Sequence, residues 1–179
     1  MYFYEFYDSP VGRLTVASDE TGMIGLWLAH QRFYMDVLQG RECEEKETDI
    51  IRLAKMWLDR YFAGEKPEIR ELPIKFIGSN FRVSVWQMLT EIPYGKVITY
   101  GDLAKKITAK KGIKAMSAQA VGGAVGKNPI SIIVPCHRVI GANGNLTGYS
   151  GGINTKIKLL EFEGVDCSAL YAPQNLIDQ

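Results

Sequence analysis

Long apolar segments are missing from this chain of 179 residues, although 46 % of its side chains are hydrophobic and 11 % are aromatic. No stretch approaches the roughly 20 apolar residues that a membrane-spanning helix needs. The opening residues, MYFYEFYDSPVG, place no basic segment ahead of an apolar one, so no secretory signal is readable. We therefore expect a globular protein of the cytoplasm, or of the nucleus in a eukaryote, without a membrane partner.

Cysteine and histidine are also scarce, with three and two residues respectively. Cys43, Cys136 and Cys167 are odd in number and form no CxxC pair, so they indicate neither a disulfide framework nor a zinc knuckle. His30 has no ligand-like residue close to it in the sequence. Because a metal site needs more ligands than this chain offers, we expect free thiols and no metal.

A complete phosphate-binding loop is missing as well, although AVGGAVGKN places glycines beside Lys127. The Walker pattern needs a glycine five positions before Gly126 and a serine or threonine after Lys127. Those positions hold Val121 and Asn128. The sequence therefore disfavours nucleotide binding by this route.

Two glycines within the helix predicted at AVGGAVGKN cost about 1 kcal/mol each relative to alanine. A gain in packing could offset this cost in either of two ways. The small side chains could pack tightly on another helix, or they could lie against a backbone or enter a narrow groove. The face in question consists of Ala120, Gly123, Ala124 and Lys127.

The net charge of +1 hides an uneven distribution along the chain. Residues 1–80 carry 10 basic and 14 acidic side chains, residues 81–140 carry 9 and 2, and residues 141–179 carry 2 and 4. The middle third is therefore a basic region in an otherwise mildly acidic protein. Such a region suits a polyanionic partner, although a solvated lysine-rich loop, KKITAKKGIK, accounts for five of the nine basic residues.

The first eighty residues predict a small α+β unit. Apolar and polar side chains alternate in FYEFYD, RLTVAS and MIGLWLA, which predicts a three-stranded antiparallel meander, and the charged QGRECEEKETD after it predicts a loop. Thr48 or Asp49 can cap a helix that runs to about Phe62 and ends at Gly64. The predicted apolar face of this helix is Ile50, Leu53, Ala54, Trp57, Leu58 and Tyr61.

The pattern becomes mainly helical near Asn80. FRVSVWQMLTEI has helical spacing and stops at PYG, Thr99 can cap a short helix YGDLAKKI, and Ser117 can cap a third, AQAVGGAVGK. These helices predict a helix-turn-helix. A strand ISIIV, a hairpin or wing at GANGN and a final helix NTKIKLLEFEG are predicted to follow it.

The predicted fold class is thus α+β, in two domains. Residues 1–78 form a small N-terminal supporting domain of antiparallel sheet and helix. Residues 79–166 form a mainly helical C-terminal domain resembling a winged helix-turn-helix, and residues 167–179 form a tail. Only the C-terminal domain offers recognisable chemistry.

That chemistry centres on Cys136, in the segment PCHRV. A free cysteine is most often an inert buried residue. Here Pro135 fixes the approach to the thiol, His137 can draw off its proton, and glycine-rich segments leave room for a ligand. Because neighbouring side chains on a strand point apart, the pair needs a turn or a bridging water. A cysteine protease is the alternative, but its histidine normally comes from a distant segment, and the other histidine is His30.

Five segments together resemble the O6-alkylguanine-DNA alkyltransferases, also called methylated-DNA-protein-cysteine methyltransferases. They are IPYGKVITYGDLA, AVGGAVGKNPI, VPCHRVIGANG, LTGYSGG and KLLEFEG, in that order and spacing. The resemblance is dense over residues 81–164 and continues more loosely into SPVGRL. It implies direct DNA repair, in which an alkyl group passes from O6 of a guanine flipped out of the duplex to a protein cysteine.

The resemblance also implies a role for each matching residue. Cys136 would be the nucleophile, His137 would take its proton through a water, and Glu163 would orient the histidine. Asn128 would brace the loop, and Tyr100 would sit on the flipped base and protonate the departing guanine. The implied DNA- and base-binding residues are Gln119, Ala120, Gly123, Lys127, Arg138, Val139, Tyr149, Ser150 and Gly151.

Within that set, the main chain of Ser150 would bind O6, and the carbonyls of Cys136 and Val139 would accept from the exocyclic amine. The helix at 117–127 would enter the minor groove of double-stranded DNA that contains O6-alkylguanine. Displacement at a saturated carbon needs no metal and no cofactor. Because a thioether has no good leaving group at sulfur, the protein should act once per molecule. We also expect it to be a monomer.

One position departs from the family pattern. Counted back from PCHRV, Gln119 stands where the family usually has an arginine that fills the gap left by the flipped base. Glutamine is shorter and uncharged, so we expect base flipping with weaker DNA affinity, partly offset by the basic insertion KKITAKKGIKAM.

Two other functions stay open. A sensor could bind alkylated guanine without repairing it, but relatives of that kind replace the acceptor cysteine, commonly by tryptophan, and Cys136 is present. A transcription regulator could use the same helix-turn-helix, but no effector domain is recognisable.

Overall fold

The computed structural model describes residues 1–173, which divide into two compact units. The N-terminal unit contains Met1–Gly78 and also Pro129–Ile133, a segment that returns from the second half of the chain. The C-terminal unit contains Ser79–Asn128 and the chain from Val134 onward. Residues 174–179, the end of the predicted tail, lie outside the described part.

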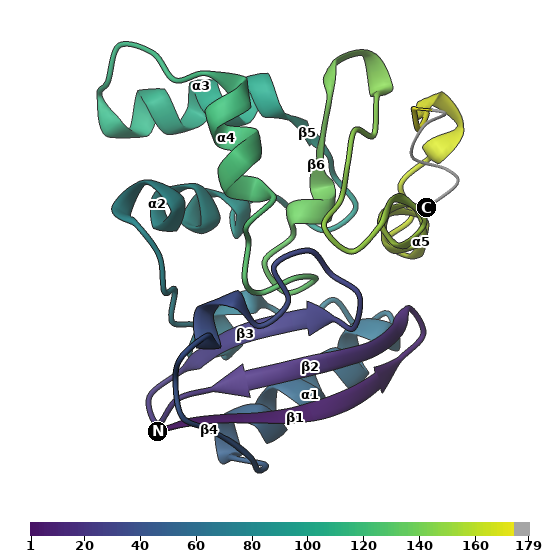
Figure 1. The fold of residues 1–179 in the computed structure, drawn as a ribbon. Coiled ribbons are helices and arrows are strands. Elements are labelled where there is room, and N and C mark those ends of the chain that lie inside the picture. The colour runs from purple at the N-terminus through teal and green to yellow at the C-terminus, as the bar shows by residue number, and fades with distance from the viewer. Residues whose placement is uncertain (174–179) are drawn as a thin grey trace. The chain divides into compact units, whose positions relative to one another are not determined.

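A four-stranded sheet forms the N-terminal unit (Figure 1). The predicted meander is confirmed: β1 (Tyr2–Ser9), β2 (Gly12–Ser18) and β3 (Met23–Leu28) pair antiparallel in sequence order. The loop prediction for QGRECEEKETD is wrong in part, because β4 (Cys43–Glu45) lies parallel to β1. The charged run hid this short strand because its outward side chains are exposed and carry no apolar alternation.

Helix α1 (Asp49–Phe62) lies across one face of this sheet (Figure 1). The Thr48 side chain accepts a hydrogen bond from the amide of Ile51, which confirms the predicted cap. The buried face is rotated from the prediction: Ile51 is buried, whereas Leu53 is 40 % exposed. Its remaining buried members are Ala54, Trp57, Leu58 and Tyr61, as the sequence predicts.

The return segment, Pro129–Ile133, is buried but is not the predicted strand. Its main chain meets β3 through two hydrogen bonds, from Leu26 N to Pro129 O at 2.9 Å and from Ser131 N to Leu26 O at 2.9 Å. Beyond this single bridge the backbone turns, because Ile132 has a φ of 69°. An apolar run therefore predicted the burial correctly and the conformation wrongly.

Three helices pack together in the C-terminal unit (Figure 1). They are α2 (Asn80–Leu89), α3 (Tyr100–Lys111) and α4 (Ala118–Val125). The side chains of Thr99 and Ser117 cap α3 and α4, as predicted. The predicted ends are less accurate, since α3 extends beyond YGDLAKKI and α4 stops before Lys127. The indole of Trp86 donates to the Ala124 carbonyl at 2.9 Å and so joins α2 to α4.

Short elements and a last helix complete this unit. Strands β5 (Ile98–Thr99) and β6 (Val139–Ile140) pair in parallel. The turn predicted at GANGN is present as the 3-10 turn Ala142–Gly144, and the amide of Gly141 closes it by donating to the Asn145 carbonyl at 2.6 Å. The described residues do not form the paired strands of a hairpin there, because Asn145 bridges in parallel to Tyr171. Helix α5 (Ile153–Phe162) is confirmed and packs its apolar side chains with Ile140 and Leu146.

Further 3-10 turns lie at Asp36–Leu38, Ile69–Glu71, Cys136–Arg138 and Cys167–Ala169. Within residues 1–173, no helix combines the length and the apolar character that a membrane span requires.

Candidate active site

Cys136 begins the 3-10 turn Cys136–Arg138, directly after Pro135. Its side chain is buried, with 3 % of its surface exposed. The amide of Cys136 donates to the Val134 carbonyl at 2.8 Å, which tightens the chain just before the turn. Because the pair sits on a turn and not on a strand, the alternation that would separate Cys136 from His137 does not apply here.

Asn128 connects the end of α4 to this cysteine. Its amide nitrogen Nδ2 donates to the Val134 carbonyl at 2.8 Å and to Sγ of Cys136 at 3.1 Å. Its own backbone N–H donates to Val125 in the last turn of α4 at 3.1 Å. The asparagine is 2 % exposed, so these contacts are shielded from water. It lies where the sequence reading placed the brace of the loop.

The environment of the thiol works in two directions. Burial raises the pKa of Cys136, while the hydrogen bond from Asn128, the positive charge of Lys156 and the nearby Tyr149 lower it. Burial prevails, so the pKa stays above its ordinary value. At neutral pH the sulfur therefore keeps its proton until a base removes it.

His137 and Glu163 form a buried pair beside the thiol. His137 Nε2 lies 2.7 Å from Glu163 Oε1, and both side chains have 0 % exposure. Within residues 1–173 the other ring nitrogen, Nδ1, has no hydrogen-bond partner. Burial lowers the pKa of His137 despite the nearby carboxylate, so the imidazole is neutral at pH 7 and can accept a proton.

Arg138 holds the opposite side of the same carboxylate. Its Nε donates to Glu163 Oε2 at 2.8 Å and its Nη2 to Oε1 at 3.0 Å. Burial opposes ionisation of Glu163, but the hydrogen bonds from His137 and Arg138 outweigh it and hold the pKa well below its usual range. Glu163 is therefore a carboxylate that can orient the imidazole and stabilise its protonated form.

The PYG turn supports this network from another direction. The amide of Gly95 donates to Glu163 Oε2 at 3.2 Å, and Arg138 Nη1 donates to the Ile92 carbonyl at 2.6 Å. The guanidinium also lies 5.6 Å from the centre of the Tyr94 ring. Arg138, implied from the sequence as a DNA- or base-binding residue, is thus 6 % exposed with its donors directed at protein acceptors.

Lys156, on α5, is a residue that the sequence reading missed. It has 0 % exposure, and its Nζ donates to the carbonyls of Val139 at 2.6 Å, Leu146 at 2.7 Å and Gly148 at 3.4 Å. Burial lowers its pKa to about 8. It lies seven residues before Glu163, the residue that directly follows α5, and a lysine on an apolar helix face was the available signal.

Residues implied to hold a base lie on two segments. Tyr100 begins α3; its hydroxyl accepts from Thr147 at 3.4 Å, and burial followed by the nearby Cys136 raises its pKa. A methyl group at Gly122 of α4 would lie 3.6 Å from the Tyr100 ring, so that helix passes close beside it. Tyr149, Ser150 and Gly151 are half-buried on the loop before α5, and Val139 is buried.

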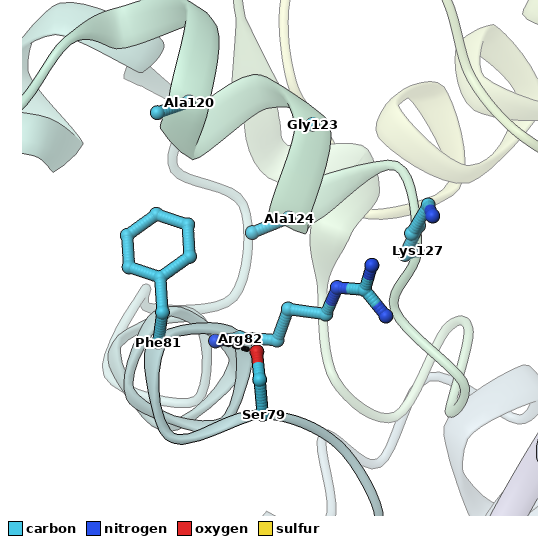
Figure 2. Close-up of a pocket in the computed structure, with 7 residues that line it drawn as sticks. All are labelled: Ser79, Phe81, Arg82, Ala120, Gly123, Ala124 and Lys127. Carbon is cyan, nitrogen blue, oxygen red and sulfur yellow. Dashed lines mark hydrogen bonds between the residues drawn. The ribbon is translucent and has the colours of Figure 1, made fainter.

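A groove lies between the start of α2 and one face of α4, as Figure 2 shows. It has a volume of about 360 Å³ and is lined by Ser79, Phe81, Arg82, Ala120, Gly123, Ala124 and Lys127. The side chains of Arg82 and Lys127 both extend along it. A Cβ at Gly123 would meet none of the described atoms within 4 Å, so α4 is open at this glycine, whereas Ala124 on the same face is 3 % exposed. Gln119 is exposed in the first turn of α4.

The structure thus gathers Cys136, His137, Glu163 and Asn128 into one buried cluster, and it places Gln119, Ala120, Gly123 and Lys127 on or beside the open face of α4. Within residues 1–173, no group of three His, Cys, Asp or Glu side chains is arranged to hold a metal ion.

Both units match known proteins over most of their length. Residues 80–165 match the model of the 6-O-methylguanine DNA methyltransferase DNA-binding domain, and residues 2–76 match the ribonuclease-like domain of the same family. A methylated-DNA–protein-cysteine methyltransferase of Haemophilus influenzae is 39 % identical over 163 residues, which are 91 % of this chain and 87 % of that protein. One from Methanosarcina acetivorans is 40 % identical, covering 90 % of this chain and 98 % of that protein.

Among solved structures, Mycobacterium tuberculosis OGT in complex with DNA matches with a TM-score of 0.78 and 41 % identity. The match covers 90 % of this chain and 93 % of that one.

Proposed function

Because this chain belongs to the 6-O-methylguanine DNA methyltransferase family, we propose that it repairs DNA directly, by moving an alkyl group from O6 of guanine to Cys136. The observation that carries this proposal is the buried cluster around the thiol. Asn128 donates to Sγ at 3.1 Å, and a neutral histidine held by a carboxylate stands next to it in the chain. This arrangement supplies a nucleophile, a base and a group that orients the base.

The reaction begins with loss of the thiol proton. Because burial raises the pKa of Cys136, a base must take the proton. Nδ1 of His137 can accept it, since this ring nitrogen has no hydrogen-bond partner among the described residues. A bridging water carries the proton from Sγ to Nδ1. Glu163 stays ionised and stabilises the imidazolium that forms.

Transfer is then a single displacement. The Cys136 sulfur forms a bond to the alkyl carbon while the bond between that carbon and O6 breaks, and guanine leaves with the electron pair. The Tyr100 hydroxyl donates a proton to the departing base. The proton that His137 accepted then returns to the Tyr100 oxygen. The product is a thioether, which has no good leaving group, so each molecule acts once and needs no cofactor.

DNA reaches the site along the open face of α4. The matched DNA-binding domain and the DNA complex of the mycobacterial relative support a DNA partner. Alanine and glycine at positions 120 and 123 let α4 enter a minor groove, and Arg82 and Lys127 in the 360 Å³ groove meet backbone phosphates. Ser79, whose side chain caps the start of α2, also lines this groove.

The decisive experiment is the intact mass of the protein after incubation with duplex DNA that contains O6-methylguanine. We expect one proton to be replaced by one methyl group in the wild type, and no change in Cys136→Ala. A wild type that binds the duplex without gaining mass would show instead a non-repairing sensor of alkylated guanine. Free O6-benzylguanine as a second substrate separates chemistry from DNA binding.

The role of Gln119 is tested with the same two substrates. If Gln119 fills the gap left by the flipped base less effectively than arginine would, Gln119→Arg should react faster than the wild type on duplex DNA and equally fast on free O6-benzylguanine. Arg82→Ala and Lys127→Ala should weaken duplex binding and reduce its salt dependence. A Gln119→Arg variant with no gain on the duplex would show that glutamine is not a handicap.

A further inference from the structure

Lys156 is a buried charged group that the proposed reaction does not use. The residue has 0 % exposure in the middle of α5, where its neighbours Leu159 and Leu160 also have 0 %. An ammonium removed from water carries a large desolvation cost unless it is hydrogen-bonded. Here its three hydrogens point at three main-chain carbonyls. The site is thus built for a lysine, which calls for a functional reason.

The three carbonyls belong to two separate segments beside Cys136. Val139 directly follows the Cys136–Arg138 turn, and its carbonyl accepts from Nζ at 2.6 Å. Leu146 and Gly148, whose carbonyls accept at 2.7 and 3.4 Å, lead into the Tyr149–Gly151 loop. A single ammonium therefore fixes the chain that carries the nucleophile relative to the loop that would hold the base.

The charge of Lys156 acts on the same atoms. It lowers the pKa of Cys136, and ionised Cys136 in turn raises the pKa of Lys156. It also lowers the pKa of His137, which favours the neutral imidazole before the reaction. Both effects favour a thiolate beside a base that is ready to accept its proton.

Building on the proposed function, we propose that Lys156 is a positioning residue for alkyl transfer. Its ammonium holds the two segments that border the base, and its positive charge favours the thiolate of Cys136. It touches neither the alkyl group nor the guanine. A carbonyl oxygen has two lone pairs, so Val139 can accept from Lys156 and from an exocyclic amine together.

The pH dependence follows from the groups that face Lys156. They are Cys136 and His137 from the 3-10 turn, and Tyr149 lies near Cys136. Because the pKa of Lys156 is about 8, the ammonium is mostly intact at pH 7 and is lost as the pH rises further. The transfer rate should therefore fall on an alkaline limb near pH 8, although a thiol alone would become more reactive there.

Lys156→Met tests the proposal, because methionine keeps a linear side chain and removes the charge. Lys158→Met is the matched control, since Lys158 is exposed one half-turn further along α5. Two measurements are needed, each from pH 6 to 9.5. The first is the single-turnover transfer rate at several concentrations of free O6-benzylguanine, which gives the maximal rate at each pH. The second is the rate at which iodoacetamide labels the Cys136 peptide. In the labelling step sulfur bonds to the CH₂ carbon and iodide leaves.

We expect Lys156→Met to lower the maximal transfer rate about tenfold or more, to raise the apparent pKa of Cys136 labelling, and to abolish the alkaline limb. Lys158→Met should match the wild type. Lys156→Arg keeps the charge at high pH, so it should move the alkaline limb upward, and it decides the question if the methionine variant does not fold. A folded Lys156→Met or Lys156→Arg with the wild-type pH profile would overturn the proposal.

Failure of the proposed function would look different. A wild type that accepts no alkyl group from O6-benzylguanine removes the transfer reaction, yet the iodoacetamide profile still reports whether Lys156 controls the Cys136 thiol. A shifted labelling profile would then support the charge effect without the repair function.

Discussion

The two units differ in the charges that they bury. In the N-terminal unit ion pairs lie at the surface, as between Arg13 and Asp8, whose side chains are 59 % and 77 % exposed. In the C-terminal unit Arg138 and Glu163 pair at 2.8 Å with exposures of 7 % and 0 %. His137 joins the second pair, and Lys156 lies buried nearby. The C-terminal unit also has exposed ion pairs, such as Lys105 with Asp102, but it adds buried charges to them.

This difference separates support from chemistry. Exposed ion pairs are screened by solvent and contribute little to stability, so their exact partners matter little. Buried charges carry a desolvation cost that well-packed apolar residues would avoid. A unit that keeps Glu163 ionised within its core gains something other than stability, and an oriented, neutral histidine beside Cys136 is what it gains.

The largest loss of stability and of transfer rate should come from removing one partner of the buried ion pair between Arg138 and Glu163. Arg138→Met leaves the Glu163 carboxylate without its bidentate partner in a dry site, and breaking such pairs costs about 3–5 kcal/mol. Transfer to Cys136 should slow by about 100-fold or more as the imidazole loses its oriented acceptor. Urea unfolding and single-turnover rates measure both effects.

Arg82→Met is the matched control, because it makes the same substitution at a half-buried arginine that lines the groove between α2 and α4. It should leave the free energy of unfolding and the reaction with free O6-benzylguanine nearly unchanged. An Arg138→Met protein as stable as the wild type would show that Glu163 does not depend on the guanidinium for its charge.

The contrast between units reflects what could be predicted from sequence. Helices of the C-terminal unit were predicted with their Thr99 and Ser117 caps because a cap is a local contact over three residues. The meander was predicted because side-chain alternation is also local. Such signals exist wherever the deciding partners are close in the chain.

The features that failed depend on distant partners. The turn at Ile132 and the bridge from Ile130 to Leu26 need the folded N-terminal unit, so the apolar run alone could not distinguish them from a strand. Arg138 and Glu163 stand 25 positions apart, so their pairing was invisible in the sequence. Lys156 was not singled out from the sequence, because the carbonyls that accept from it lie 8, 10 and 17 positions away.

The next largest difference between the units should be the loss of stability in acid, because the buried His137 and Glu163 belong to the C-terminal unit. The folded-state pKa of His137 lies below its ordinary 6.5, so below that pH the unfolded chain takes up a proton that the native chain refuses, and stability falls. The pKa of Glu163 is also lowered, so its contribution is present above about pH 4.5 and is lost as the pH falls further. Both groups make the protein less stable in acid.

His137→Gln should remove the first part of that decline, just below pH 6.5, in urea midpoints measured at several pH values. His30→Gln, at an exposed position of the N-terminal unit, is the control and should retain it. If both variants lose stability in acid as the wild type does, His137 is not the group responsible.

The smallest effect belongs to the N-terminal unit, where the buried polar contacts are neutral. The Ser131 hydroxyl donates to Gln31 Oε1 at 2.8 Å, and the two residues are 0 % and 4 % exposed. Ser131→Ala removes this bond, but Gln31 Oε1 still accepts from the amide of Leu28 at 3.2 Å, so no acceptor is left unsatisfied. We expect a loss of about 1 kcal/mol by urea unfolding, without the pH dependence of the buried charges.

Arg13→Ala, which removes an exposed ion pair of the same unit, should leave the unfolding midpoint within experimental error. A larger loss for Arg13→Ala than for Ser131→Ala would reverse the comparison, because it would mean that surface charges stabilise the supporting unit.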